Sequence, residues 1–213
     1  MRNYFLDLKY VIKNYSRNKY FVIEFILTIL FLIISLTLFS RFLVFVEARD
    51  GVVLNDVLLN QFEAIDLSYF IFFTIYGSIL FTLSKVVLQP YRLLLLFQSY
   101  SMMIILRMLF MLLLPLSPPI GAIILKDPLV DIFGSVVFTK DLFFSGHTAT
   151  MFILYKVLPK EYKSYFLLIT LILMASLLLQ KTHYSIDVLV APFISIFCVS
   201  FCKSILKNQS KLD

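Results

Sequence analysis

Residues 20–46 read YFVIEFILTILFLIISLTLFSRFLVFV and carry only two charges, Glu24 and Arg41. A helix that crosses the ~30 Å hydrocarbon core of a bilayer needs about 20 predominantly apolar residues. This run exceeds that length, so it predicts a membrane-spanning helix. Glu24 lies near the start of the run, where we expect its carboxylate to extend toward water.

Further apolar runs follow along the whole chain. Hydrophobic residues make up 61% of the sequence and charged residues 15%, which is too little polar surface for a soluble domain of this length. We expect one all-α domain, residues 1–213, built as a polytopic six-transmembrane-helix bundle. The fourth span is short, so its polar start near Ser145 is expected at the membrane interface. The six predicted spans are residues 20–46, 67–88, 91–115, 145–158, 164–181 and 184–206.

Basic residues are divided unequally between the two ends of the predicted bundle. One end receives thirteen of the nineteen Lys and Arg residues: Arg2, Lys9, Lys13, Arg17, Lys19, Lys85, Arg92, Lys156, Lys160, Lys163, Lys203, Lys207 and Lys211. The opposite end receives Arg41, Arg49, Lys126, Lys140 and Lys181. Because Lys- and Arg-rich ends stay in the cytoplasm, we expect both termini to be cytoplasmic, with the basic amphipathic residues 1–19 on the membrane surface. The opposite end would face the periplasm, the cell exterior or a lumen.

The only two histidines, His147 and His183, each lie in a short polar run between apolar spans. They are 36 positions apart, enough for one helix across the membrane and one back, so we expect both at the outer end. Asp187 follows His183 by four residues, which on a helix would place the two side chains on one face. Ser145 and Gly146 precede His147 at a predicted helix start, where backbone N–H groups and the helix dipole favour a phosphate.

These residue types suit phosphoester transfer. A carboxylate that accepts one ring N–H of a histidine fixes its tautomer and leaves the other nitrogen free as a nucleophile. We therefore predict His183 as the nucleophile, oriented by Asp187, and His147 as the acid that protonates the departing lipid alkoxide. Either histidine alone is more often an interfacial hydrogen-bonding ring, but a positioned acid–base set is rare by chance, so the combination favours catalysis.

The two polar runs resemble those of the type-2 phosphatidic acid phosphatase superfamily, and more closely its sphingomyelin synthase branch. That branch carries Cys-Gly-Asp, three residues, then Ser-Gly-His-Thr, and later His-Tyr-Thr-x-Asp-Val. Here Asp141 precedes Ser145-Gly-His-Thr148, Thr139 and Lys140 replace the Cys-Gly, and residues 183–188 read HYSIDV. The resemblance implies catalytic roles for His147, His183 and Asp187, and a role for Asp141 in orienting His147.

The phosphatase branch fits less well. Its members carry Lys, six residues, then Arg-Pro; Lys85 and Arg92 have this spacing, but Leu93 replaces the proline. Both residues also fall at the basic end, across the membrane from His147. The phosphatases further place Ser-Arg before the second histidine, where this chain has Ser176 and Leu177. The arginine that would bind phosphate there is missing, so we interpret Lys85 and Arg92 as topological anchors.

Further polar residues are candidates for substrate binding. They are Ser145, Gly146, Arg107, Lys181 and Tyr184. Arg107 lies inside a span, where a charge commonly faces a cavity or a partner; it would contact a substrate phosphate or pair with a polar group. Asp56 and Asp66 are expected to be solvated loop carboxylates. Cys198 and Cys202 are expected to pack in the bundle.

The pattern predicts an enzyme of lipid phosphoesters. The preferred reaction transfers a phosphocholine or phosphoethanolamine headgroup from a phospholipid donor to a lipid alcohol such as ceramide, through a phosphohistidine. One alternative is hydrolysis of the same class of substrate by a lipid phosphatase or phospholipase C. The sequence does not separate the two reactions, because water as the acceptor needs no binding residue of its own. A second alternative is a non-catalytic lipid-binding or transport protein. No metal or cofactor is expected, and no nucleic-acid-binding element is recognised.

Overall fold

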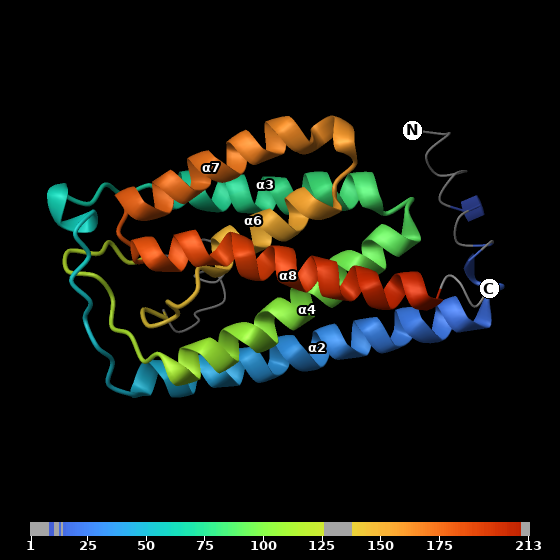
Figure 1. Cartoon of the computed structure of the whole chain (residues 1–213), viewed down its shortest axis with the longest axis horizontal. Helices are drawn as coiled ribbons and strands as arrows, with labels where there is room; N and C mark the ends of the chain where they lie inside the picture. Colours follow the sequence, from blue (N-terminus) through green and yellow to red (C-terminus); the bar gives the residue numbers. More distant parts are fainter. Residues whose placement is uncertain (1–8, 11–12, 14, 126–137, 210–213) are drawn as a thin grey trace.

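The computed structural model describes residues 9–10, 13, 15–125 and 138–209. These residues are all-helical, as the sequence predicts, and they define six α-helices arranged side by side (Figure 1). The helices are α2 (Lys19–Ala48), α3 (Ser68–Val86), α4 (Pro90–Leu113), α6 (Gly146–Val157), α7 (Lys163–Leu179) and α8 (Ser185–Gln209). Two 3₁₀ turns, η1 (Leu59–Gln61) and η2 (Lys160–Tyr162), lie in the connections.

Five of these helices are long and apolar enough to cross a membrane: α2, α3, α4, α7 and α8. They suggest an integral membrane protein, in agreement with the predicted class. The fourth predicted span, residues 145–158, corresponds to α6, which has 12 residues. At 1.5 Å per residue α6 is about 18 Å long, shorter than the ~30 Å hydrocarbon core. By length and composition five helices could cross the membrane, so the six-span count that we predicted is not confirmed.

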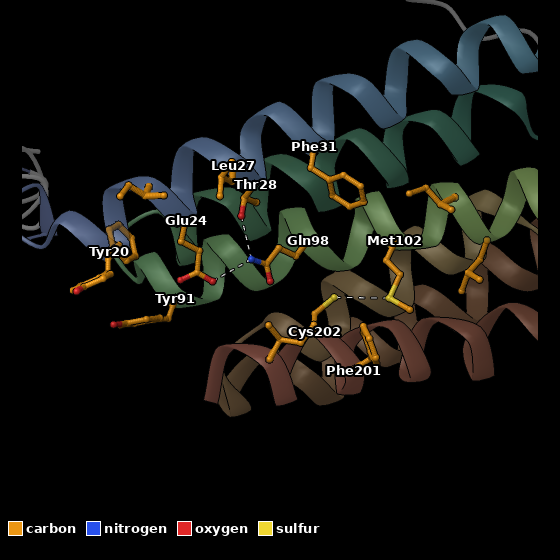
Figure 2. Close-up of a pocket in the computed structure, with 15 residues that line it drawn as sticks. Tyr20, Glu24, Leu27, Thr28, Phe31, Tyr91, Gln98, Met102, Phe201 and Cys202 are labelled. Carbon is orange, nitrogen blue, oxygen red and sulfur yellow. Dashed lines mark hydrogen bonds between the residues drawn. The ribbon is translucent and has the colours of Figure 1, made fainter. Parts of the chain in front are cut away.

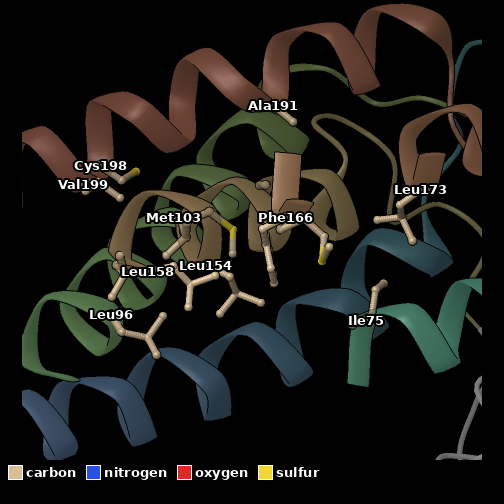
Figure 3. Packing of buried hydrophobic residues seen from close by; sticks show 14 of the residues in the cluster. Ile75, Leu96, Met103, Leu154, Leu158, Phe166, Leu173, Ala191, Cys198 and Val199 are labelled. Carbon is tan, nitrogen blue, oxygen red and sulfur yellow. The ribbon is translucent and has the colours of Figure 1, made fainter. Parts of the chain in front are cut away.

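Protein surrounds the short helix α6, which packs against α8, α4, α7 and α3. Figure 3 shows side chains of the apolar cluster that these helices share, among them Met103, Leu154 and Phe166. The chain before α6 is not helical, yet Phe144 and Ser145 are fully buried. Irregular backbone is tolerated at membrane depth only where protein or a polar cavity covers it. The central position of α6 thus allows the polar segment before it to enter the bundle.

The helices alternate in direction, which gives the bundle two distinct ends. At one end, here called the site end, the start of α3 meets the end of α7: the Ile65 N–H donates to the Leu179 carbonyl at 3.0 Å. The starts of α6 and α8 lie at this end. At the other end, here called the basic end, Arg92 Nη1 donates to the carbonyl of Val157, the last residue of α6, at 2.7 Å.

Lys85 and Arg92 both make their contacts at the basic end of the bundle. Lys85 Nζ lies 4.9 Å from the ring centroid of Tyr162, and the guanidinium of Arg92 caps the negative end of the α6 dipole. His147 is at the opposite end of α6. This placement agrees with the interpretation of Lys85 and Arg92 as topological anchors at the basic end.

Candidate active site at the start of α6

A polar turn begins α6. Ser145 is the N-cap, and its Oγ accepts a hydrogen bond from the Thr148 N–H at 3.4 Å. The Ser145 N–H donates to the carbonyl of Asp187 at 3.1 Å, which fixes the start of α6 against the start of α8. The N–H groups of a first helical turn lack intrahelical partners. Together with the helix dipole they give this point a positive partial charge that favours a phosphate.

Arg107, from α4, adds a full positive charge at the same point. Its guanidinium lies directly against Gly146, and a Cβ added to Gly146 would overlap Nη1. Glycine is therefore required at the first position of α6 for this approach. Arg107 Nε donates to the carbonyl of Phe144 at 3.1 Å, and the side chain is almost fully buried. A fixed guanidinium and a helix N-terminus thus meet at Gly146.

Asp141 has a different partner from the one we predicted. Arg107 Nη2 and Asp141 Oδ1 form an ion pair at 2.5 Å. Among the described residues no hydrogen bond joins Asp141 to His147. A buried guanidinium is strongly destabilised without a counter-charge, and the non-helical chain before α6 brings Asp141 to α4 to provide it. Asp141 therefore neutralises and positions Arg107, in place of the predicted orientation of His147.

His183 and Asp187 meet through a turn. Because α8 begins at Ser185, His183 precedes the helix, and the predicted stacking of the two residues on one helix face is wrong. Asp187 Oδ2 accepts a hydrogen bond from the Tyr184 N–H at 3.0 Å, as an acidic residue in the first turn does when it caps a helix. The same oxygen lies 3.6 Å from His183 Nδ1, with both side chains buried. This contact is longer than a hydrogen bond, but it aligns a carboxylate with the imidazole.

The two histidines face each other across the interface of α6 and the turn before α8. Their ring centroids are 6.1 Å apart with planes inclined by 61°. The ring of Phe72, from α3, also lies near His147, with 6.1 Å between the two ring centroids. His183 is 3% exposed, whereas His147 is half-buried. The structure therefore brings the predicted nucleophile and acid together, in a site that is largely shielded from water.

The polar ends of the Lys181 and Tyr184 side chains both contact other groups of the protein. Lys181 has a positive φ of 57° at the end of α7, and its Nζ lies 5.4 Å from the ring centroid of Phe62. The Tyr184 hydroxyl donates to the Ser117 carbonyl at 2.8 Å and accepts from the Leu54 N–H at 3.0 Å. Their predicted substrate-binding roles find no support in these contacts, because both side chains are buried against loops of the site end.

Sequence reasoning missed two carboxylates that hold the site together. Asp56, predicted to be solvated, accepts hydrogen bonds from the N–H of Ser185 at 2.7 Å and from its hydroxyl at 3.0 Å. Glu47 accepts from the N–H groups of Thr139 and Lys140 at 2.8 and 3.0 Å. Glu47 and Thr139 are 92 positions apart in the sequence, and Asp56 and Ser185 are 129 apart. No local sequence pattern could therefore have indicated these contacts.

The comparison with known families agrees with the geometry. Residues 140–205 match the family model described as PAP2 superfamily C-terminal. The matched region contains Asp141, Ser145, His147, His183 and Asp187. Members of this superfamily are phosphatases and phosphotransferases, so the match suggests activity on lipid phosphoesters. No curated protein matches the chain.

Proposed function

We propose that this chain is a membrane-embedded phosphotransferase that moves a phospholipid headgroup, phosphocholine or phosphoethanolamine, to a lipid alcohol such as ceramide. The observation that carries the proposal is the cluster at the start of α6. There the Arg107 guanidinium lies against Gly146, and the His147 and His183 rings are 6.1 Å apart. A phosphate group held at Gly146 would have one cation, one helix N-terminus and two imidazoles as neighbours.

In the first step His183 attacks the phosphorus of the donor lipid. Its Nδ1 faces Asp187, so Nε2 is the nucleophile and forms the new P–N bond. The P–O bond to the diacylglycerol breaks, and His147 in its protonated form donates a proton to the departing oxygen. The negative phosphate bound beside His147 favours that protonated form. The products of this step are a diacylglycerol and a headgroup-bearing phosphohistidine on His183.

In the second step the lipid alcohol collects the headgroup. His147, now neutral, removes the proton of the acceptor hydroxyl. The acceptor oxygen attacks the phosphorus, the P–N bond breaks, and His183 is restored as a neutral ring. The low exposure of His183, 3%, supports transfer over hydrolysis because a shielded intermediate is protected from water.

The charge of the cluster favours a phosphodiester as substrate. A phosphomonoester such as phosphatidic acid carries more negative charge than a headgroup diester and would need several fixed cations. The cluster at Gly146 contains Arg107, and Asp141 already offsets part of its charge. Lys140 Nζ donates to the carbonyls of Glu47 and Arg49, and Lys181 lies over Phe62. One arginine and a helix N-terminus suit a single phosphate charge.

The test is turnover by purified protein in vesicles. Phosphatidylcholine, phosphatidylethanolamine and phosphatidic acid are supplied as donors, each with and without a ceramide or glyceride acceptor. We expect the diesters to yield headgroup-bearing product only when the acceptor is present, and phosphatidic acid to be a poor substrate. Inorganic phosphate released from phosphatidic acid at a comparable or faster rate would overturn the proposal and favour a phosphatase. Absence of turnover on all three donors would favour a non-catalytic lipid-binding protein.

A further inference from the structure

A second site of defined chemistry lies far from the histidines, in a groove between α2, α4 and α8. The groove has a volume of about 930 Å³, within the range of small-molecule sites. Its walls are apolar and include Phe31, Met102 and Phe201 (Figure 2). Its lining residues include Tyr20 and Tyr91, which lie at the beginnings of α2 and α4, at the basic end of the bundle.

Three polar side chains meet inside this apolar groove. Gln98 Nε2 donates to Glu24 Oε1 at 3.3 Å and to Thr28 Oγ1 at 3.1 Å, and all three side chains line the groove. Figure 2 shows the cluster between α2 and α4. An ionisable residue on a membrane helix is costly, and it commonly marks a site for a partner.

The depth of the cluster selects the kind of ligand. Glu24 is five residues beyond the start of α2, and Gln98 is eight beyond the start of α4, or about 7 and 12 Å along the helices. The headgroup layer of a bilayer occupies only the outer ~5–8 Å of each side. Helix α2 has 30 residues and is about 45 Å long, which matches the full thickness of a bilayer with its headgroups. With α2 placed across that thickness, the cluster would lie below the phosphates, at the level of a lipid's glycerol or sphingoid oxygens. A headgroup amine would stay above this level, but a free hydroxyl on the lipid backbone would reach it.

We propose that the groove binds a neutral two-chain lipid alcohol, of the diacylglycerol or ceramide class. Its hydroxyl would donate to the carboxylate of Glu24, which as a group can accept about four hydrogen bonds. The hydroxyl oxygen would accept from the Gln98 amide, and the acyl chains would lie along the apolar walls. The site is at the opposite end of the bundle from His147 and His183, and its occupancy does not depend on the proposed reaction.

Competition for photolabelling tests this proposal on the wild-type protein. Purified full-length chain in phosphatidylcholine nanodiscs is labelled with a diacylglycerol that carries a photoreactive group in one acyl chain, and labelled peptides are mapped. We expect labelling of peptides from α2, α4 and α8. Unlabelled diacylglycerol should compete at least roughly tenfold better than the same lipid with its hydroxyl methylated, because the ether cannot donate a hydrogen bond. Ceramide as a competitor separates the two sources of the hydroxyl.

Two variants complete the test. Glu24→Leu should reduce labelling of the groove by roughly tenfold, whereas Thr74→Val, in a separate apolar groove between α3 and α7, should leave it unchanged. Equal competition by the methyl ether, or full labelling of Glu24→Leu, would overturn the proposal and leave only ordinary annular lipid. If Glu24→Leu fails to fold, the wild-type competition decides alone. Since binding is measured and not turnover, failure here leaves the proposed headgroup transfer intact.

Discussion

Gly146 and Arg107 show how one residue choice permits another at the candidate site. Arg107 comes from α4 and Gly146 from the first position of α6, and the guanidinium occupies the space that a Cβ would need. Asp141 and the Phe144 carbonyl hold the guanidinium in place from the chain just before α6. A rigid arginine costs less ordering on binding phosphate than a mobile one. Because Gly146 has no side chain, it leaves room for the Arg107 guanidinium in the proposed phosphate site.

Gly146→Ala should displace the Arg107 guanidinium. We expect headgroup transfer to fall by roughly 100-fold, since a shift of about 1 Å in a positioning group has effects of that size, and stability to fall by about 1–3 kcal/mol through overpacking. Turnover and thermal unfolding of the purified variant measure both effects. The matched control is Gly77→Ala in α3, where a Cβ would meet no heavy atom within 4 Å. Equal activity of the two variants would show that the Arg107 contact has no catalytic importance.

Asp187→Asn separates the two roles of Asp187. The amide oxygen can still accept from the Tyr184 N–H, so the start of α8 should remain folded. The amide cannot stabilise the charged imidazole of His183, so we expect most activity to be lost. His147→Ala should lose about 10²- to 10⁴-fold, the usual contribution of a general acid. Circular dichroism and turnover distinguish the outcomes; wild-type turnover by Asp187→Asn would reduce Asp187 to a helix cap.

At the residue scale the sequence singled out the residues of the candidate site but not all of their contacts. His147, His183 and Asp187 stood out because polar runs are rare in so apolar a chain. The Arg107–Asp141 ion pair joins positions 34 apart on different elements, and such contacts leave no mark in local spacing. Nor does spacing reveal that α8 begins after His183, because a four-residue interval fits a helix face and a capping turn equally well.

The start of helix α8 is anchored by the connection between α2 and α3, which is distant from it in the sequence. Asp56 receives hydrogen bonds from the N–H and hydroxyl of Ser185 and from the N–H groups of Leu58 and Leu59. Burial acts to raise the pKa of Asp56, but these hydrogen bonds outweigh it, so its pKa lies below the ordinary value of 3.8. The carboxylate thus acts as an external cap that holds the turn containing His183.

Asp56→Ala should loosen this end of α8. The Ser185 N–H would lose its acceptor, which costs about 1–3 kcal/mol when such a group is left unpaired, and we expect a lower melting temperature together with slower transfer. The matched control is Glu63→Ala, an exposed carboxylate in the same connection. Because the pKa of Asp56 is lowered in the folded state, its contribution is present above about pH 3.8 and is lost as the pH falls through the folded pKa. An unchanged melting temperature for Asp56→Ala would contradict the anchoring role.

Element boundaries followed closely from hydrophobic run length. The first span was predicted at residues 20–46 and is Lys19–Ala48; the fourth was predicted at 145–158 and is Gly146–Val157. The length of an apolar run did not indicate how deeply each segment would be buried within the bundle. Leu142 and Phe144 are as apolar as helical neighbours, yet they form irregular chain buried by the other helices. Whether a 12-residue helix spans a bilayer or lies within a bundle depends on what surrounds it.

Viewed as a whole, the molecule is strongly asymmetric in charge. At the basic end Lys19, Lys85, Arg92 and Lys163 lie at helix ends, and Lys203 lies in the C-terminal part of α8. The described cations of the site end include Arg49, Lys140 and Lys181, each in contact with protein groups. Arg2, Lys126 and Lys211 of the predicted pattern lie outside the described residues. With the positive-inside rule, this asymmetry leads us to propose cytoplasmic termini and a site on the outer leaflet.

Cysteine labelling in intact cells tests that orientation. In a variant without Cys198 and Cys202, which are both buried, Glu63→Cys should react with an impermeant thiol reagent. Lys160→Cys, at the opposite end of the bundle, should react only after the membrane is opened. The reverse pattern would move the histidines to the cytoplasmic side and remove the outer-leaflet assignment.

The covalent step on His183 is the centre of the proposed mechanism, and mass spectrometry can observe it. Wild-type protein is incubated with phosphatidylcholine without acceptor, and the peptide containing His183 is analysed under conditions that preserve phosphohistidine. We predict a phosphocholine adduct on His183 that disappears when a lipid alcohol is added, with equivalent appearance of the transferred product. His183→Ala should carry no adduct and show no transfer while remaining folded. Wild-type transfer by purified His183→Ala would contradict the mechanism.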